Sequence, residues 1–500
     1  MLLAAALLLA MPAARAAEPA QTLLLKVVIN GRPTSRIGAF TDRRGVLYAT
    51  PRELRGVGFR LPRTAGTGPV ALGSLPGVSY RIDMPMQRLL VTAADESLSP
   101  TLIGGSARNP DAAAAVQSAT GGALDYSIVG TSLARQTIVS GLFDGRLFTP
   151  YGVAGSGFLA DMGTGLDQTV RLGSTYTYSD PATLRRYRAG DVISGGLSWT
   201  RPVRLGGVQI TTDFSMRPDL VTFPVPRISG QVAVPSAVDV LVNGIRQFSG
   251  NVPPGPFQVQ QLPVVTGAGT VSVVVTDALG QQTTQTLPFY ASTQLLAPGL
   301  DDYSFEAGAV RLDYGVRSDD YRDMAGSASF RHGVSSWLTL EGHAEATPGL
   351  FMGGAGAAID VGNLGVLSFS AAGSAAGGRG GWQFGVRIER VTPVVSFAAS
   401  TLISSRGFRD IAAMNADPVP RVLTQASAGL SLGRFGSFGV AYTGIERDAF
   451  RTPQPFVPAF DAGVGGLSAP GYLVPAQHVQ LITASYTKPL FGNIVAYATG

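Results

Sequence analysis

Glu341, His343 and Glu345 are the residues whose types and spacing come nearest to a chemical site in this chain. They alternate with Gly342 and Ala344, so on a β-strand their three side chains would share one face. Two carboxylates beside an imidazole could hold a metal ion. A water-filled barrel interior explains three polar groups on one strand face better than a metal site does. The sequence therefore predicts charges that face a lumen.

Other stretches with the same two-residue alternation carry charges on their polar face. The predicted lumen-facing set is Arg171, Glu341, His343, Glu345, Arg387 and Glu389. For any one of these side chains, hydration of the interior is a simpler role than control of a gate. The chain has three histidines and contains neither an H-E-x-x-H nor a G-x-S-x-G pattern. We therefore expect no catalytic residues, no bound metal and no cofactor.

The elements that carry these charges are strands of bilayer-crossing length. In 338–346 the odd positions are polar and the even positions are Leu, Gly or Ala, and 364–372, 394–402, 438–446 and 479–487 are further candidates. A soluble sheet with one wet face would show the same alternation. The succession of such strands, with 64 glycines and 14% charged residues in 500, favours a transmembrane antiparallel β-barrel.

The N-terminal region is predicted to leave the cytoplasm and to fold separately. Residues 1–16 have an apolar run that ends in Ala-Arg-Ala, which indicates a secretory signal peptide. Residues 17–103 are predicted to be a small periplasmic α+β domain, in which Thr50 caps a short helix, and 104–122 a linker. An apolar run in this domain could dock a partner, although such runs usually pack a core: Leu23, Leu24, Leu25 and Val27.

Residues 228–294 have the pattern of a small all-β domain. Val238, Val240 and Val242 alternate before Asn243-Gly244, a pair that supplies the two positive φ angles of a tight hairpin turn. Proline cannot donate to a strand ladder, so the following run breaks the pairing: Pro253, Pro254, Gly255, Pro256 and Phe257. We expect these residues to shape the domain rather than to contact a substrate.

This domain interrupts the series of long strands. Residues 123–227 are predicted to form the first part of the barrel and 295–500 the second part. The last strand begins near 495, so the sequence predicts an incomplete barrel with an open edge. Export and barrel composition together indicate the outer membrane of a Gram-negative cell.

Four motifs carry a resemblance to a known family. They are Arg188-Ala-Gly-Asp-Val-Ile-Ser194, Met216-Arg-Pro-Asp219, Val238-Asp-Val-Leu-Val-Asn-Gly244 followed by Val252-Pro-Pro-Gly-Pro-Phe257, and Leu295-Leu296 with Tyr303-Ser-Phe-Glu-Ala-Gly308. In this order, the region 184–308 resembles the fimbrial (pilus) outer-membrane ushers of the chaperone–usher pathway. The compact N-terminal domain is similar to that of the archaic branch.

The resemblance implies a pore with an inserted immunoglobulin-like plug and a periplasmic N-terminal domain. It also implies the partners: a periplasmic pilus chaperone bound to pilin subunits, the pilus fibre and outer-membrane lipid, but no nucleic acid and no nucleotide. The pilus would grow by donor-strand exchange, a form of β-strand addition, and would be translocated through the barrel.

The chain departs from the family pattern in three respects. The exported chain has a short tail before Leu23, lacks the cysteine pair of many members, and contains no C-terminal domains. The short tail means that the family's docking residues do not carry over directly to this chain. Without C-terminal domains, this chain alone would not be expected to catalyse pilus assembly.

Two other functions remain as alternatives. One is a porin or gated transporter for small solutes, although in gated receptors the plug precedes the whole barrel, whereas here strands come before and after it. The other is an outer-membrane hydrolase, for which the sequence offers no nucleophile and base pattern.

Overall fold

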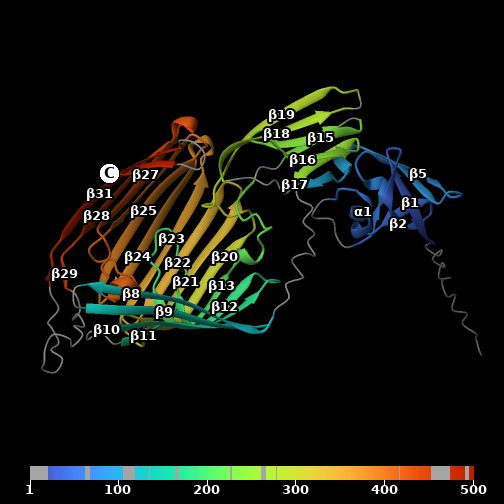
Figure 1. Ribbon diagram of the computed structural model, residues 1–500. Coiled ribbons are helices and arrows are strands. Elements are labelled where there is room, and N and C mark those ends of the chain that lie inside the picture. The colour runs from blue at the N-terminus through green and yellow to red at the C-terminus, as the bar shows by residue number, and fades with distance from the viewer. Residues whose placement is uncertain are drawn as a thin grey trace, which may run out of the picture.

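The computed structural model consists almost entirely of β-strands arranged as an N-terminal domain, an inserted domain and a barrel (Figure 1). The structure describes residues 21–61, 68–104, 119–133, 136–163, 168–225, 228–232, 234–260, 266–277, 279–415, 417–451, 473–489 and 495–499. The predicted signal peptide 1–16 and most of the predicted linker 104–122 lie outside these residues. Within the described ranges, no helix has the length and apolar character needed to cross a membrane.

The N-terminal domain is a six-stranded sheet with one helix on it, in the order β4-β3-β2-β1-β6-β5. Thr50 caps the helix as predicted, because its Oγ1 accepts the Glu53 N–H at 3.2 Å, and Gly58 ends the helix at φ 110°. The elements are β1 Gln21–Ile29, β2 Arg32–Arg43, β3 Val46–Ala49, α1 Pro51–Val57, β4 Val70–Ala71, β5 Val78–Asp83 and β6 Arg88–Ala93.

The inserted domain comprises β14 to β19 and packs two sheets over one apolar core. One sheet has the order β16-β15-β18-β19 and the other has the order β14-β17-β7. Asn243 and Gly244 take φ angles of 50° and 80° in the predicted two-residue turn. The strands are β7 Thr101–Gly104, β14 Ile228–Val232, β15 Ser236–Val242, β16 Ile245–Val252, β17 Gly255–Gln260, β18 Gly267–Thr276 and β19 Gln282–Ala291.

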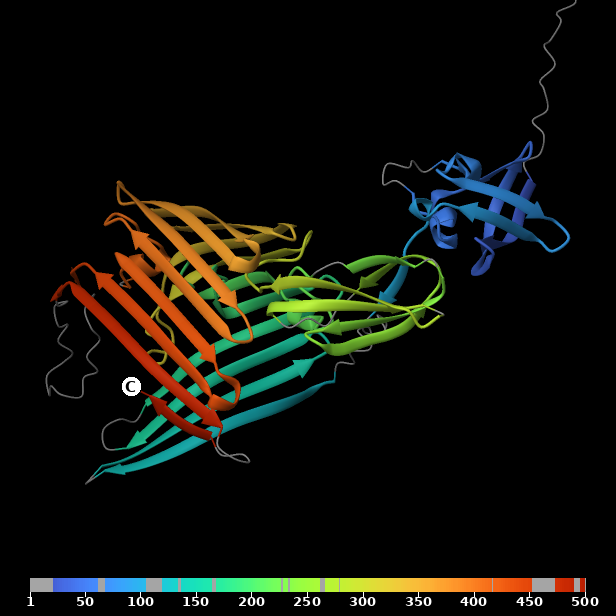
Figure 2. The same cartoon turned by 90° about the horizontal axis from the view of Figure 1, so that it is seen from above.

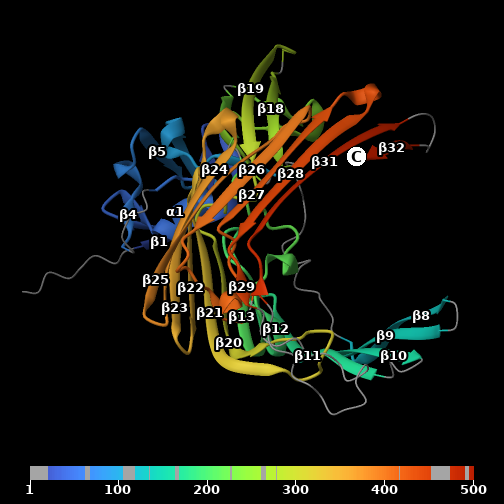
Figure 3. The ribbon, with the colours of Figure 1, turned by 90° about the vertical axis from the view of Figure 1, so that its left-hand side faces the viewer.

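The barrel strands stand side by side in one strongly curved sheet (Figure 3). Chain neighbours pair antiparallel, and β13 pairs directly with β20 across the inserted domain. The strands are β8 Gly121–Leu133, β9 Gln136–Thr149, β10 Gly152–Gly163, β11 Gln168–Asp180, β12 Arg185–Ile193, β13 Arg204–Thr212, β20 Asp301–Arg311, β21 Tyr321–Ser335, β22 Leu338–Thr347, β23 Leu350–Asp360, β24 Val366–Ala376, β25 Arg379–Val391, β26 Val395–Ser404, β27 Val422–Ser431, β28 Ser437–Arg447, β31 Gln477–Pro489 and β32 Val495–Thr499.

The end of the barrel differs from the expectation of an open edge. The strand order is that of a closed barrel, in which β8 follows β32. Closure gives edge N–H and C=O groups a partner, and each unpaired group would cost several kcal/mol in hydrocarbon.

The inserted domain stands at one end of the barrel, between the barrel and the N-terminal domain (Figure 2). It contacts the barrel through β18 against β25 and through β19 against the short turn η5, Gly362–Leu364. On its other side it contacts the strand β7, which continues from the N-terminal domain. In this structure it therefore lies beyond the strands rather than among them.

Candidate functional site

Strand β22 presents the polar face that the alternation predicts. Thr339, His343 and Glu345 are buried, whereas Leu340 is 46% exposed on the opposite face. Strand β23 has the same division, with Met352 buried and Phe351 63% exposed. The buried side of both strands is therefore the inner side of the barrel, and the exposed side carries the apolar residues that lipid would cover.

Two segments between strands fold against this inner side. The first inner segment is residues 194–203, between β12 and β13, and the second is residues 405–415, between β26 and β27. Trp199 of the first segment and Phe408 and Ile411 of the second are buried in one cluster with Met352. The chain itself thus covers this part of the inner side of the barrel wall.

Small residues make room for the indole of Trp199. A Cβ at Gly354 would lie 2.9 Å from the ring, and one at Gly356 would lie 3.0 Å from Nε1. Both distances are too short for unstrained packing, so strand β23 accepts the ring only because these positions lack a side chain. The indole N–H donates to Glu341 Oε2 at 3.1 Å.

The two inner segments are joined by an ion pair. Arg201 Nε donates to Asp410 Oδ2 at 2.7 Å, and its Nη2 donates to the other oxygen of the same carboxylate. Asp410 also caps the short helix α2, Ile411–Met414, by accepting the Ala413 N–H. Only 6% of the Asp410 side chain is exposed, so this bidentate contact holds a charge that would otherwise be buried alone.

His343 connects both inner segments to the wall. Its Nδ1 lies 2.9 Å from Ser329 Oγ, and its Nε2 lies 3.0 Å from Glu345 Oε1. Ser329 Oγ is also 3.1 Å from the Gly195 carbonyl, which it can donate to, and Glu345 Oε2 accepts the Ile411 N–H at 2.7 Å. The order serine, histidine, carboxylate is that of a hydrolytic triad. Here the inner segments cover all three side chains, so the contacts tether those segments.

Glu341 links the same region to the inserted domain. Its Oε1 accepts from Arg331 Nε at 3.2 Å, and Arg331 Nη2 donates to the Gln294 carbonyl at 2.8 Å. Gln294 lies in the return linker, residues 292–300, which leads from β19 back to β20. Thr339 Oγ1 accepts the Leu296 N–H from the same linker at 2.7 Å. The linker is therefore fixed along β21 and β22.

Arg387 and Glu389 lie near the other contact of the inserted domain. They form an ion pair at 2.9 Å along β25. Beside them, the Val391 N–H donates to the Tyr290 hydroxyl at 3.1 Å. Burial raises the pKa of Tyr290, which is on strand β19, so its hydroxyl stays protonated. These charges therefore mark the place where the inserted domain meets the barrel.

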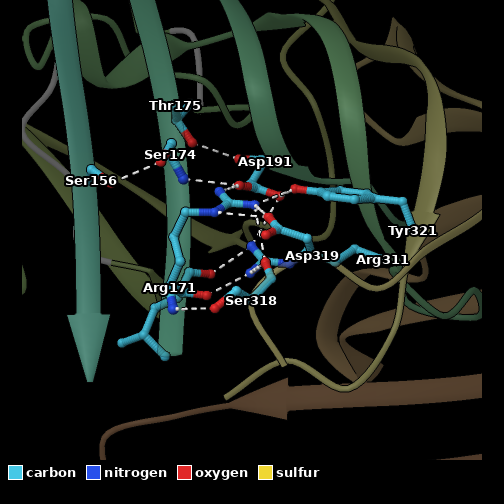
Figure 4. Close-up of polar contacts among 10 residues, drawn as sticks. Ser156, Arg171, Ser174, Thr175, Asp191, Arg311, Ser318, Asp319 and Tyr321 are labelled. Carbon is cyan, nitrogen blue, oxygen red and sulfur yellow. Dashed lines mark hydrogen bonds and ion pairs between the residues drawn. The ribbon is translucent and has the colours of Figure 1, made fainter. Parts of the chain in front are cut away.

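Arg171 belongs to a separate cluster in the barrel wall (Figure 4). Strand β11 pairs with β12 only from Thr175 onwards. At this point Gly190, at φ 110°, lies so close to the Ser174 carbonyl that no side chain would fit. Before Thr175, the backbone groups of β11 bond to side chains instead of to the neighbouring strand. Arg311 donates to the carbonyls of Leu172 at 2.6 Å and Arg171 at 2.7 Å.

Asp191 holds this second cluster together. It contacts Arg171 at 2.5 Å and Arg311 at 2.9 Å, and it accepts from the Tyr321 hydroxyl at 2.6 Å. It also accepts the Ser174 N–H at 2.9 Å. The cluster thus seals the place where β11 and β12 separate.

The six predicted charges therefore fall into three places. Glu341, His343 and Glu345 come together, the pair Arg387 and Glu389 lies at the inserted domain, and Arg171 is in the wall. The sequence analysis missed the residues that complete these places: Asp191, Trp199, Arg201, Arg311, Tyr321, Arg331 and Asp410. Of these, Asp191 had a visible signal, since it belongs to the quoted motif that starts at Arg188.

The candidate docking residues of the N-terminal domain divide between core and surface. Leu25 and Val27 are 2% and 0% exposed in the domain core, and Leu23 packs against that core. Leu24 is 64% exposed. Of the four, Leu24 is therefore the most exposed to a partner.

The fold is a β-barrel whose inner side carries two folded segments and whose chain contains a small β domain between β13 and β20. Residues 186–379 match the model of the outer membrane usher protein family. This match spans barrel strands on both sides of the inserted domain. This region of the chain is therefore similar to the outer membrane usher proteins.

Individual relatives agree over part of their length. The outer membrane usher protein FimC of Bordetella pertussis is 32% identical over 162 residues, which are 32% of this chain and 18% of that protein. The outer membrane usher protein YehB of Escherichia coli K12 is 28% identical over 174 residues, 35% of this chain and 18% of that protein. The matched segment thus spans less than a fifth of either relative.

One solved structure shares the fold over most of the chain. It is the P pilus tip assembly intermediate PapC-PapD-PapK-PapG of E. coli, determined by cryo-electron microscopy. The TM-score is 0.50 and the identity is 17%, with 96% of this chain and 66% of the other chain covered.

Proposed function

We propose that this chain is an usher that receives chaperone–pilin complexes, supports donor-strand exchange and translocates the growing pilus through its barrel. The match over residues 186–379 carries the proposal, because it includes the inserted domain together with the strands that flank it. The assembly step would be β-strand addition between subunits, which draws on their folding free energy. The chain would therefore act without nucleotide or cofactor and would not be an enzyme.

In this function the inserted domain is the gate of the pore. The gate would occupy the barrel in the closed state and stand at its end, as in this structure, in the open state. The return linker supports this role, because Arg331 and Thr339 bind it to the same strands that hold the inner segments.

Deletion of residues 230–292 tests the gate. We expect the deletion variant to insert as a barrel and to show a greatly raised conductance in planar bilayers, because no domain remains to enter the lumen. A matched deletion of the N-terminal domain, residues 21–99, should leave the pore able to close, because the inserted domain is still present. Conductance of the 230–292 variant equal to that of the full chain would contradict the gate.

Docking of the chaperone–pilin complex is proposed for the exposed face around Leu24. We expect Leu24→Asp to reduce capture of that complex by the full chain, because the substitution places a charge on an apolar contact surface without entering the core. The control is Thr22→Asp, at an exposed position on the same strand. Equal capture by Leu24→Asp and the unmodified chain would remove Leu24 from the docking surface.

A further inference from the structure

The strand β17 has neighbours from two distant parts of the chain. On one side it pairs antiparallel with β14 of its own domain, from Ile228 opposite Val259 to Val232 opposite Gly255. On the other side it pairs in parallel with β7, from Phe257 opposite Thr101 to Gln260 opposite Gly104. The central strand of this small sheet is therefore completed by a segment that lies outside the inserted domain in the sequence.

The pairing uses the backbone of a strand whose side chains already serve the core. Phe257 and Val259 are 2% and 3% exposed between the two sheets. Without β7, the outer edge of β17 would present unpaired N–H and C=O groups, as any sheet edge does. That edge is therefore a strand-acceptor site, and β7 occupies it here.

The segment that fills this site is held by the N-terminal domain immediately before it. The Ser99 N–H donates to the Gly58 carbonyl at 2.8 Å, and Leu98 forms a bridge with Phe59. Only Pro100 separates Ser99 from Thr101, and two residues span at most about 7 Å. The N-terminal domain and the inserted domain are thus tied almost without slack.

We propose that Thr101–Gly104 is a strand clip, which binds the acceptor edge of β17 and couples the position of the inserted domain to the N-terminal domain. The coupling rests on the proposed function of the inserted domain as a gate. While the clip is paired, the inserted domain stays beside the N-terminal domain and the pore is open. For the inserted domain to enter the barrel, β17 must release the clip and its edge must find other partners.

The chain contains no cysteine, so engineered pairs report on this contact without background. The test pair is Leu102→Cys with Gln258→Cys, two directly opposed positions in the parallel ladder. The matched control is Leu102→Cys with Gln285→Cys, whose second position is exposed on β19 in the other sheet. Both pairs are made in the full chain, oxidised, and reconstituted in planar bilayers.

We expect the test pair to form a disulfide and the control pair to form none. Closures of the pore should disappear in the oxidised test pair and return when dithiothreitol is added. Absence of the disulfide, or equal yield in the control pair, would overturn the clip. A disulfide that leaves closures unchanged would overturn its coupling to the gate.

The 230–292 deletion distinguishes failure of the strand clip from failure of the proposed gate. If the deletion raises conductance and the pore of the oxidised test variant still closes, the inserted domain is a gate but the clip does not control its position. If the deletion behaves like the full chain, the gate fails and the coupling with it, while the disulfide yield still reports whether β7 pairs with β17.

Discussion

At the scale of single residues, charged side chains stand in for backbone pairing. Where β11 separates from β12, Arg311 supplies donors to two carbonyls of β11 and Asp191 accepts one of its N–H groups. The side chain of Arg311 is 1% exposed, so these bonds form away from water. Hydrogen bonds of this kind are costly to lose, because each buried partner is left unsatisfied.

Removal of Arg311 should therefore weaken the barrel. We expect Arg311→Met to destabilise the folded state by about 3–5 kcal/mol, because Asp191 would keep a buried charge with fewer partners. The measurement is the temperature at which the folded barrel loses its fast mobility in SDS gels. Arg322→Met is the control, since its side chain is 57% exposed and its partner Asp320 keeps a second contact, with Arg317 at 3.5 Å. Equal midpoints for both variants would contradict the role of Arg311.

How far single residues could be predicted depends on the range of the contact. Alternation alone places Glu341, His343 and Glu345 on one face, because a two-residue period is a local property of a strand. The contact between Asp191 and Arg311 joins residues 120 positions apart in the sequence. No local sequence pattern encodes that contact, so it could be identified only from the three-dimensional structure.

At the scale of elements, the two inner segments cover part of the inner side of the barrel wall. They are held by one ion pair between Arg201 and Asp410, by the packing of Trp199 on glycines, and by the bonds of His343 and Glu345 to the wall. Each contact joins a connecting segment to a strand or to the other segment. The inner segments are therefore a unit that should loosen as a whole.

A charge exchange between the segments tests this unity. We expect Arg201→Asp and Asp410→Arg each to raise conductance and protease cleavage within 405–415, because each leaves like charges together at a buried site. The double variant should recover part of the loss, since the ion pair is restored in reverse. Additive effects of the two changes would show that the segments are not coupled through this pair.

Strands were predictable in this chain, whereas the inner segments were not. The expected stretches 364–372 and 394–402 correspond to β24 and β26, because alternation over a bilayer-crossing length is a strong signal. The segment around Trp199 has no period. Its position depends on Gly354 and Gly356, which are far away in the sequence, and therefore on the closed shape of the barrel.

At the scale of the whole molecule, the inserted domain is held from two sides. The clip strand β7 ties it to the N-terminal domain, and the return linker ties it to the barrel. The linker is bonded to Arg331, Arg331 is bonded to Glu341, and Glu341 is bonded to Trp199 of the first inner segment. A movement of the inserted domain would therefore act on the side chains that hold Trp199 against the wall.

Substitution of Arg331 would remove the contact between the return linker and Glu341. We expect Arg331→Met to increase both the frequency of conductance fluctuations and the cleavage of the return linker, because the Gln294 carbonyl and the Glu341 carboxylate, whose side chain is 10% exposed, each lose a donor. Arg246→Met is the matched control within the inserted domain. The Arg246 side chain is 66% exposed, and its contact with Asp239 is long, at 3.8 Å. If Arg331→Met fluctuates no more than this control, the return linker does not transmit the position of the inserted domain to the interior, and the clip at β7 would be the connection that controls it.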